Sequence, residues 1–441
     1  MIIKNLISTF SNIEYKKINN IAIPLMLNKF SAMIISICDE AMIGRVSLLG
    51  FASVGIISTT VNSITGVLGS ISVGFNIIGS RCKGENDYDK LKSNFMLNIF
   101  ISTIVGLIFF LGTLKFGYSL IENLYGLKGE TLVQAVEYFN IFSLSIGLNM
   151  ILFTFSSYFK IMNRTKYILY GNVIASVANV LFDYILIFGK LGFPRLGIKG
   201  NAIGSILALV LNVVVYVIAI RKDEVIKILN LIENLKDTIK LSMPIMGEEI
   251  LESTILIIGV NSILSRIGVL EVSVYNLLLS IVGIASMPIY AYSQASLTII
   301  AENLSAKNIR LIKVTSRRCL LLSMIFYLSL SIIFLMLKNY IPYLITDDQQ
   351  LIKSSIEYMT LAFIINILYI PLTVYKYSLQ GCGDVNWVFI SSIIINSIGM
   401  IFIFLFTKVL SLRLYGVYIG MLLNYMLLSV AFYRRYKNLK L

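Results

Sequence analysis

The chain has 441 residues, of which 57% are hydrophobic and only 14% are charged, whereas a soluble domain carries about 25% charged residues. This composition excludes a soluble enzyme and indicates a protein that crosses a membrane several times, and the absence of histidine excludes imidazole metal sites. The net charge of +14 is expected in cytoplasmic loops, where Lys and Arg of membrane proteins gather, and not on a nucleic-acid interface.

Twelve stretches of the sequence are long and apolar enough to cross a bilayer as helices, which takes about 20 residues. With the N-terminus inside, the predicted cytoplasmic segments carry 25 of the 37 Lys and Arg residues, Lys376 among them, and the outer loops carry 11. This bias predicts that both termini are cytoplasmic. In chain order the predicted spans are 18–43, 52–80, 93–115, 133–157, 167–189, 200–220, 238–264, 273–301, 319–337, 354–377, 386–407 and 414–433.

The two halves of the sequence repeat each other at a nearly constant spacing. Pro24 in "IAIPLM" returns as Pro244 in "LSMPIM", and Glu137 in "EYF" returns as Glu357 in "EYM". The same spacing at separate places indicates an internal duplication, with six predicted spans in each copy.

The duplication predicts an all-α membrane protein of two six-helix lobes. We expect an N-lobe at 1–220, a cytoplasmic linker at 221–240 and a C-lobe at 241–441. Because six is an even number, both lobes enter the membrane in the same orientation and are related by a pseudo-twofold axis along the membrane normal. Two like bundles of this kind suit a transporter that works by alternating access, and they suit a pore or an enzyme site poorly.

Several motifs then occur in the order typical of one transporter family. The motifs are Pro24 early in the first span, Asp39 followed by Ile43 and Gly44, "GSRCKGEND" at 79–87, "LGIKGNAIGS" at 196–205 and "LQGCGD" at 379–384. In these motifs and their order the chain resembles the multidrug and toxin extrusion (MATE) family over essentially its whole length. The resemblance implies export of organic cations in exchange for Na⁺ or H⁺.

The N-lobe carries the residues that we expect to bind the coupling cation. Asp39 matches the acid of the family's first span, and Asn179 with Asp183 matches the Asn-x3-Asp pattern of its DinF-like branch, which we therefore favour. Residues four apart share one helix face, so a carboxylate and an amide oxygen there would supply hard ligands for Na⁺ or hold a proton. Asn201 or Ser205, near the start of the sixth span, could add an oxygen ligand. The alternative for Asp183 is a lone acid reaching the outer surface.

The C-lobe carries a second candidate acid. Glu252, eight residues after Pro244, matches the glutamate of the NorM-like branch. That branch also has an acid in the tenth span, where this sequence has none and Tyr369 lies at about the corresponding place. Glu40, next to Asp39, either belongs to the cation site or faces the outer loop.

Lys29 and the glutamates at the corresponding place in the second copy form a second hypothesis. Lys29 corresponds to Glu249 in the repeat, so it could pair with Glu249 or Glu248 and close the cytoplasmic side of the cleft. The alternative is that each side chain reaches the headgroups separately.

Polar residues at helical spacing in the second span could form a wall of the cleft. The alternative is that these residues serve helix packing, as small residues of membrane helices often do. They are Asn62, Thr65, Ser72 and Asn76.

The sequence thus predicts a secondary active antiporter in the bacterial cytoplasmic membrane. It would export small organic cations as a monomer, with no cofactor besides the coupling ion. A lipid-linked oligosaccharide flippase of related fold is the alternative, but its anionic cargo would require basic residues in the cleft, where this sequence has mainly acids. An intramembrane enzyme is not expected, because the sequence has no HExxH motif and no nucleophile–base set.

Overall fold

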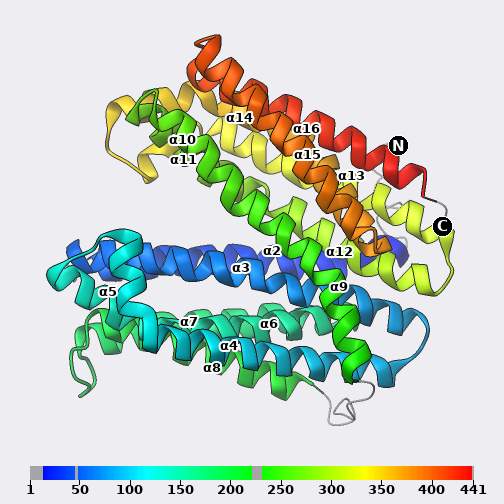
Figure 1. Ribbon diagram of the computed structural model, residues 1–441, viewed down its shortest axis with the longest axis horizontal. Coiled ribbons are helices and arrows are strands. Elements are labelled where there is room, and N and C mark those ends of the chain that lie inside the picture. The colour runs from blue at the N-terminus through cyan, green and yellow to red at the C-terminus, as the bar shows by residue number, and fades with distance from the viewer. Residues whose placement is uncertain (1–12, 45–47, 221–230, 440–441) are drawn as a thin grey trace. The chain divides into compact units, whose positions relative to one another are not determined.

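The computed structural model describes residues 13–44, 48–220 and 231–439, which are almost entirely helical and contain no β-strand (Figure 1). Each of the twelve predicted spans coincides with one helix or with a run of consecutive helices. In this part of the chain, nine helices are long and apolar enough to cross a membrane, and a tenth span results if α11 and α12, bent by 52° at their junction, count as one.

The elements follow one another with short connections. The first half contains α2 Ile13–Gly44, α3 Leu48–Gly84, α4 Tyr88–Tyr125, α5 Gly129–Phe142, α6 Leu144–Ile161, α7 Lys166–Phe188 and α8 Ile198–Ala219. The second half contains α9 Leu231–Ile250, the π-helical turn Leu251–Ile255, α10 Leu256–Ser265, α11 Val269–Ala285, α12 Met287–Ser305, α13 Ile309–Met336, the 3₁₀ turn Ile341–Leu344, α14 Gln349–Cys382, α15 Val385–Phe404, the π-helical turn Leu405–Val409 and α16 Arg413–Lys437.

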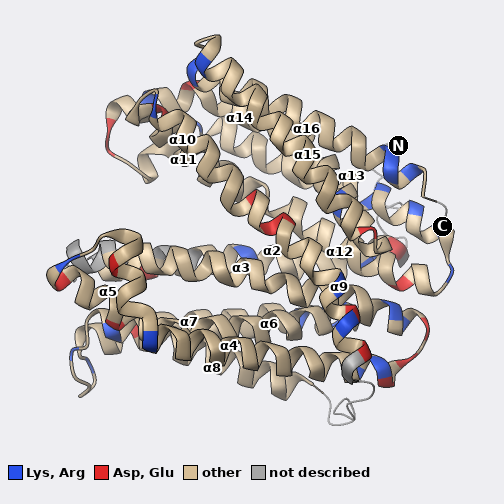
Figure 2. Ribbon diagram, viewed as in Figure 1, with Lys and Arg blue, Asp and Glu red and all other residues tan. Residues whose placement is uncertain are grey.

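The charged residues are distributed as a membrane requires. Lys, Arg, Asp and Glu gather at helix ends and in the connections, and few occur along the middle of the helices (Figure 2). On α4, the large apolar side chains of Leu107, Ile108 and Leu111 are 51%, 63% and 61% exposed. A continuous apolar surface of this kind is suited to lipid and not to water.

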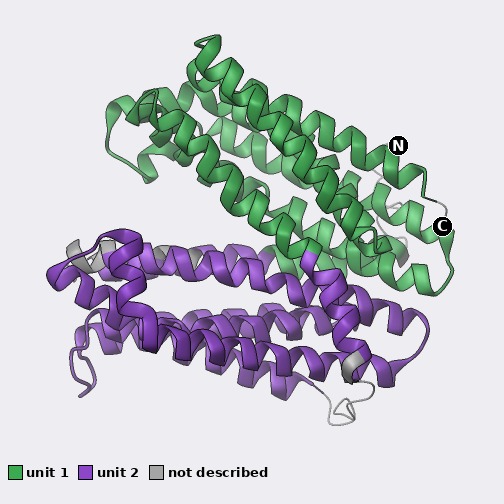
Figure 3. Ribbon diagram, in the orientation of Figure 1, with its two compact units in different colours: residues 1–26, 244–441 green, residues 27–243 purple. Residues whose placement is uncertain are grey.

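The chain forms two compact units, each with its own hydrophobic core (Figure 3). Unit 1 contains residues 1–26 and 244–441, and unit 2 contains residues 27–243. These units differ from the predicted lobes, because the start of α2 belongs with the second half of the chain and the start of α9 belongs with the first. The divisions fall shortly after Pro24 and directly before Pro244.

Polar contacts explain why the start of α2 joins unit 1. Lys17 forms an ion pair with Glu302 of α12 at 2.9 Å, and Tyr292 of α12 donates a hydrogen bond to Asn19 at 3.0 Å. Such contacts join residues far apart in the sequence, so the pattern of apolar residues could not predict them.

The start of α9 is held in unit 2 in a corresponding way. Asn234 donates to the hydroxyl of Ser93 on α4 at 3.3 Å. Ser242 lies so close to Gly74 of α3 that a Cβ atom at position 74 would come within 2.1 Å of its hydroxyl. The glycine therefore lets α9 pack directly on α3.

In each half of the chain, α7 with α8 and α15 with α16 form a hairpin in which a glycine of the second helix packs on the first. A Cβ atom at Gly204 of α8 would come within 2.1 Å of Oδ1 of Asp183 on α7, and one at Gly420 of α16 would come within 2.5 Å of Cγ1 of Ile403 on α15. The hairpins α7–α8 and α15–α16 are thus built alike. The position that holds a carboxyl group in unit 2 holds an apolar side chain in unit 1.

Candidate cation sites in the two units

The α7–α8 hairpin of unit 2 buries an acid and supplies hydrogen bonds to it. Asp183 is 0% exposed, and the amide of Asn201 donates to its Oδ2 at 2.6 Å. Asn179 lies one turn earlier on α7, opposite Ser205 of α8 at 3.4 Å. A buried carboxylate without such partners would cost several kcal/mol. The hairpin therefore provides a prepared site for this acid, which does not reach the surface.

Asp39 of α2 joins this cluster. With its amide nitrogen turned towards α2, Asn179 donates to Oδ1 and Oδ2 of Asp39 at 2.9 and 3.3 Å. The carboxyl groups of Asp39 and Asp183 lie close enough for their charges to interact. The structure therefore brings together all five predicted residues, Asp39, Asn179, Asp183, Asn201 and Ser205, although no comparison with known proteins tests their role.

The pair of carboxyl groups fits a proton or a monovalent cation. Oδ1 of Asp183 is buried and receives no hydrogen bond from a donor. Two carboxylates this close repel each other unless they share a proton or hold a cation. Asn179 suits both states, because its nitrogen can donate to Asp39, whereas its oxygen, turned the same way, adds a hard ligand of the kind that alkali and alkaline-earth cations prefer.

The cluster opens into a cavity of about 340 Å³ within unit 2, which we call the Asp39 cavity. Tyr138 of α5, which no pattern in the sequence had singled out, lines this cavity and lies close enough to Asp39 and Asp183 to interact with their charges. Asn172 and Ser176 also line it, and their steps of four, three and four residues to Asn179 and Asp183 are those of one helix face. That spacing is a signal that the sequence contained.

The four polar residues predicted to form a wall divide between the two interpretations. Asn62 lines the Asp39 cavity. Thr65 and Ser72 are buried and donate to carbonyl groups of their own helix at 2.7 Å, and the buried Asn76 accepts from Ser80 at 3.3 Å. The side chains of these three residues lie on the buried face of α3, which agrees with the packing alternative.

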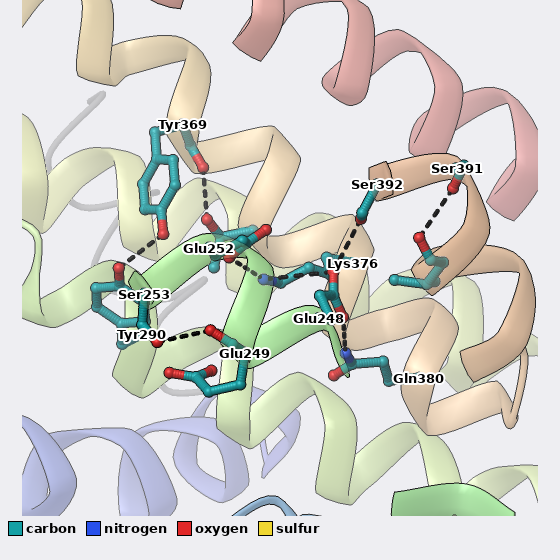
Figure 4. Close-up of polar contacts among 12 residues, drawn as sticks. Glu248, Glu249, Glu252, Ser253, Tyr290, Tyr369, Lys376, Gln380, Ser391 and Ser392 are labelled. Atoms are coloured by element: carbon teal, nitrogen blue, oxygen red, sulfur yellow. Dashed lines mark hydrogen bonds and ion pairs between the residues drawn. The ribbon is translucent and has the colours of Figure 1, made fainter. Parts of the chain in front are cut away.

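Unit 1 holds a different buried cluster, formed by α9, α14 and α15 (Figure 4). Lys376 of α14 forms ion pairs with Glu252 at 2.7 Å and with Glu248 at 3.7 Å. Glu248 also accepts hydrogen bonds from Gln380 at 2.8 Å and from Ser392 at 3.0 Å. A buried ammonium group is stable only when paired in this way, and here two carboxylates surround it.

This geometry corrects the placement of Lys376. The count of cytoplasmic Lys and Arg residues includes it, although it also falls at the end of the predicted span 354–377. In the structure it lies inside α14 and is 6% exposed. The error arose because its partners lie on α9 and the turn that follows it, far away in the sequence, so neither spacing nor hydropathy identifies them.

Glu252 lies in the π-helical turn Leu251–Ile255, a local widening of the helix that often occurs at functional sites. It borders a second cavity of about 340 Å³, which lies within unit 1 and which we call the tyrosine cavity. Tyr369, at the place where the NorM-like branch has an acid, lines this cavity and shares a hydrogen bond of 2.6 Å with Tyr290. Tyr369 therefore offers a hydroxyl group, and not a carboxylate, at this place in the tyrosine cavity.

The predicted pairing of Lys29 with Glu248 or Glu249 stays a prediction, because Lys29 belongs to unit 2 and both glutamates to unit 1. Both carboxylate oxygens of Glu248 accept hydrogen bonds within unit 1. The side chain of Glu40 lies outside the described residues.

Comparisons with known proteins agree with the repeat. The MatE family model matches residues 24–185 and 244–405, two segments that begin at Pro24 and at Pro244 and so share the spacing of the repeat. A probable multidrug resistance protein NorM of Thermotoga maritima is 23% identical over 77% of this chain and 74% of its own length. The multidrug export protein MepA of Staphylococcus aureus is 23% identical over 77% of this chain and 76% of its own length.

Solved structures show the same fold. A structure described as the outward-facing conformation of a multidrug resistance MATE family transporter superposes with a TM-score of 0.87 at 19% identity, over 96% of this chain and 95% of that one. A MOP superfamily transporter from Pyrococcus furiosus, whose description reports a binding pocket of reverse polarity, superposes with a TM-score of 0.86 at 18% identity, over 96% and 95%. These comparisons do not distinguish the DinF-like branch, which stays a prediction. The matched family model, with one copy in each half, shows that the chain belongs to the MatE family of multidrug and toxin extrusion transporters, and so to the multi-pass membrane proteins.

Proposed function

We propose that the protein is a secondary active antiporter that exports organic cations across the bacterial cytoplasmic membrane in exchange for Na⁺ or H⁺. The observation that carries this proposal is the pairing of Asp39 with Asp183 at the Asp39 cavity. An acid inside a membrane helix costs roughly 2.5–3.5 kcal/mol on insertion scales. Two of them in one cluster are best explained by a cation that is bound there and released.

The mechanism follows from competition for the same negative charge. When the coupling ion binds between the two carboxyl groups, it neutralises the charge that would otherwise attract an organic cation to the cavity. Binding of one cation therefore weakens binding of the other, and this coupling is reciprocal. Alternating access then lets the coupling ion enter from outside and the organic cation leave, with both termini in the cytoplasm.

The available energy depends on stoichiometry. A tenfold gradient of one ion supplies about 1.4 kcal/mol, and each net charge that enters adds about 2.3 kcal/mol per 100 mV. We propose that the protein works as a monomer, with small organic cations and the bilayer as its partners and no cofactor besides the coupling ion.

The buried Lys376 gives no support to a flippase for anionic cargo. Its charge is outweighed by the two carboxylates that contact it, Glu248 and Glu252. The charge available to cargo in unit 1 therefore stays negative, as it is in the Asp39 cavity.

The test is efflux of ethidium from loaded vesicles with an imposed Na⁺ or pH gradient. Wild type should export ethidium in response to one of the gradients, and Asp39→Asn should lose this response. Glu122→Gln, which removes an exposed acid of α4, is the matched control and should behave as wild type. Export by Asp39→Asn at the wild-type rate would overturn the proposal.

A further inference from the structure

The tyrosine cavity of unit 1 has the features of a site for a flat organic cation. Its volume of about 340 Å³ lies in the usual range for small-molecule sites. Tyr369 packs against Tyr290 at 6.0 Å and against Tyr425 at 5.3 Å between ring centroids. A cation that lies over the face of a tyrosine ring is attracted by it, and all three rings line the cavity. Glu249 and Glu252 provide carboxyl groups on the same wall.

Lys376 also lines this cavity, although a cation there should oppose the binding of another cation. The structure explains how it is retained. Glu248, 4% exposed, is committed to Gln380, Ser392 and the more distant contact with Lys376. Glu252 makes the short contact with Lys376, keeps 24% of its side chain exposed and borders the cavity. The ammonium group of Lys376 thus offsets one negative charge of the glutamates beside the cavity, and the cavity stays open.

We propose that the tyrosine cavity binds the transported organic cation and that Lys376 sets the charge of the cations it prefers. The lysine acts as a tethered cation that lowers the negative potential of the site. It favours monovalent over divalent organic cations, because the energy of a dication changes twice as much with each charge of the site. The inference rests on the proposed function, because the bound cation is cargo only if the protein exports organic cations. It adds the charge of the cargo that the cavity prefers.

The comparison of the two units supports this assignment. Ser156 holds the place of Lys376 in the first copy of the repeat, at the spacing that separates Pro24 from Pro244. The buried lysine of α6, Lys160, lies one turn further along that helix and does not line the Asp39 cavity. Conversely, Ile403 occupies the place of Asp183 in the α15–α16 hairpin. Unit 1 therefore has an apolar side chain in place of the Asp183 acid and a buried lysine on the wall of its cavity, which suits a site for cargo.

The experiment measures binding to the purified protein, without transport. The probes are 1-methyl-4-phenylpyridinium, a monocation, and methyl viologen, a dication of similar shape, titrated by calorimetry at fixed ionic strength. In Lys376→Gln, the ratio of dication to monocation affinity should rise by about tenfold or more, because one positive charge has been removed near the bound ligand. Lys376→Arg should keep the wild-type ratio.

Two further variants keep the test decisive if Lys376→Gln folds poorly. The double variant Glu248→Gln/Lys376→Gln removes one charge of each sign, so its ratio should return towards that of wild type. Lys353→Gln removes an exposed lysine of the same helix and should leave the ratio unchanged. Size-exclusion chromatography establishes which variants are folded.

The possible results separate the inference from the proposed function. An unchanged affinity ratio in folded Lys376→Gln, or a double variant that resembles Lys376→Gln, would overturn the role of Lys376. Failure of both probes to bind wild type that still exports ethidium would overturn the tyrosine cavity as a cargo site and leave the antiporter intact. Binding that follows the expected ratios in a protein that exports no cation under either gradient would overturn the antiporter alone.

Discussion

The two units repeat one helical plan but pair their buried charges differently. In unit 2, Asp39 of α2 meets Asp183 of α7, and no lysine or arginine takes part in the contacts of Asp183 that the structure gives. In unit 1, Glu248 and Glu252 of α9 and the adjoining turn enclose Lys376 of α14. The comparison teaches that the packing of a duplicated fold, set by its glycines, can persist while the charges within it are rearranged.

The difference also separates two roles for buried charge. The charges of unit 1 balance one another largely within the protein, which favours stability of the arrangement. Asp39 and Asp183 of unit 2 require a proton or a cation from outside to balance their charges, which favours exchange. Four substitutions, from the largest expected effect to the smallest, would sharpen or break this distinction.

Lys376→Ala should destabilise the protein by about 3–5 kcal/mol, because it leaves the carboxylate of Glu248 buried without its counter-charge. Thermal unfolding in detergent would measure the loss, with Lys353→Ala as the control on the same helix. The double variant Glu248→Gln/Lys376→Ala should recover most of this stability, because it no longer buries an unpaired carboxylate at position 248. If Lys376→Ala unfolded at the temperature of the control, the ion pairs of unit 1 would have no stabilising role.

Asp183→Asn should weaken binding of the coupling ion by about 10- to 100-fold, since a hydrogen bond or contact to a charged group contributes roughly 1.5–3 kcal/mol. The concentration of Na⁺ or H⁺ that gives half-maximal efflux measures this effect. At the equivalent place in unit 1, Ile403→Val should leave that concentration unchanged and cost only about 0.5–1.5 kcal/mol of stability. Equal effects of the two variants on coupling would remove the distinction between the units.

Gly204→Ala should cost about 1–3 kcal/mol of stability, because its Cβ atom would overlap the carboxyl group of Asp183. Gly420→Ala should cost a similar amount through overlap with Ile403. Only Gly204→Ala should also shift the ion concentration required for efflux, because it displaces a ligand. A shift in Gly420→Ala of the same size would mean that hairpin packing, and not the position of Asp183, controls coupling.

Ser205→Ala should have the smallest effect, at most about 1 kcal/mol, since its contact with Asn179 is long at 3.4 Å. A less than tenfold change in the ion concentration for half-maximal efflux is expected. Thr65→Ala, in the packed interior of α3, provides the comparison and should leave ion binding unchanged. Complete loss of coupling in Ser205→Ala would instead make its hydroxyl a principal ligand.

The sequence by itself determined the features that depend on local pattern. Spans follow from runs of apolar residues, the repeat from recurring motifs, and the fold and family predicted from them are confirmed. Asp39 and Asp183 were recognisable because an acid in a membrane helix is costly wherever it lies. Helical spacing also placed Asn179 and Asp183 on one face.

Only the tertiary structure decided which distant residues meet. It assigned the start of α2 to unit 1 and the start of α9 to unit 2, and it buried Lys376 between two glutamates of another helix. It also separated Asn62, which lines a cavity, from the packed Thr65 on the same helix. The physical reason is common to all three: an ion pair or a packing contact depends on distance in space, which spacing along a single chain does not encode.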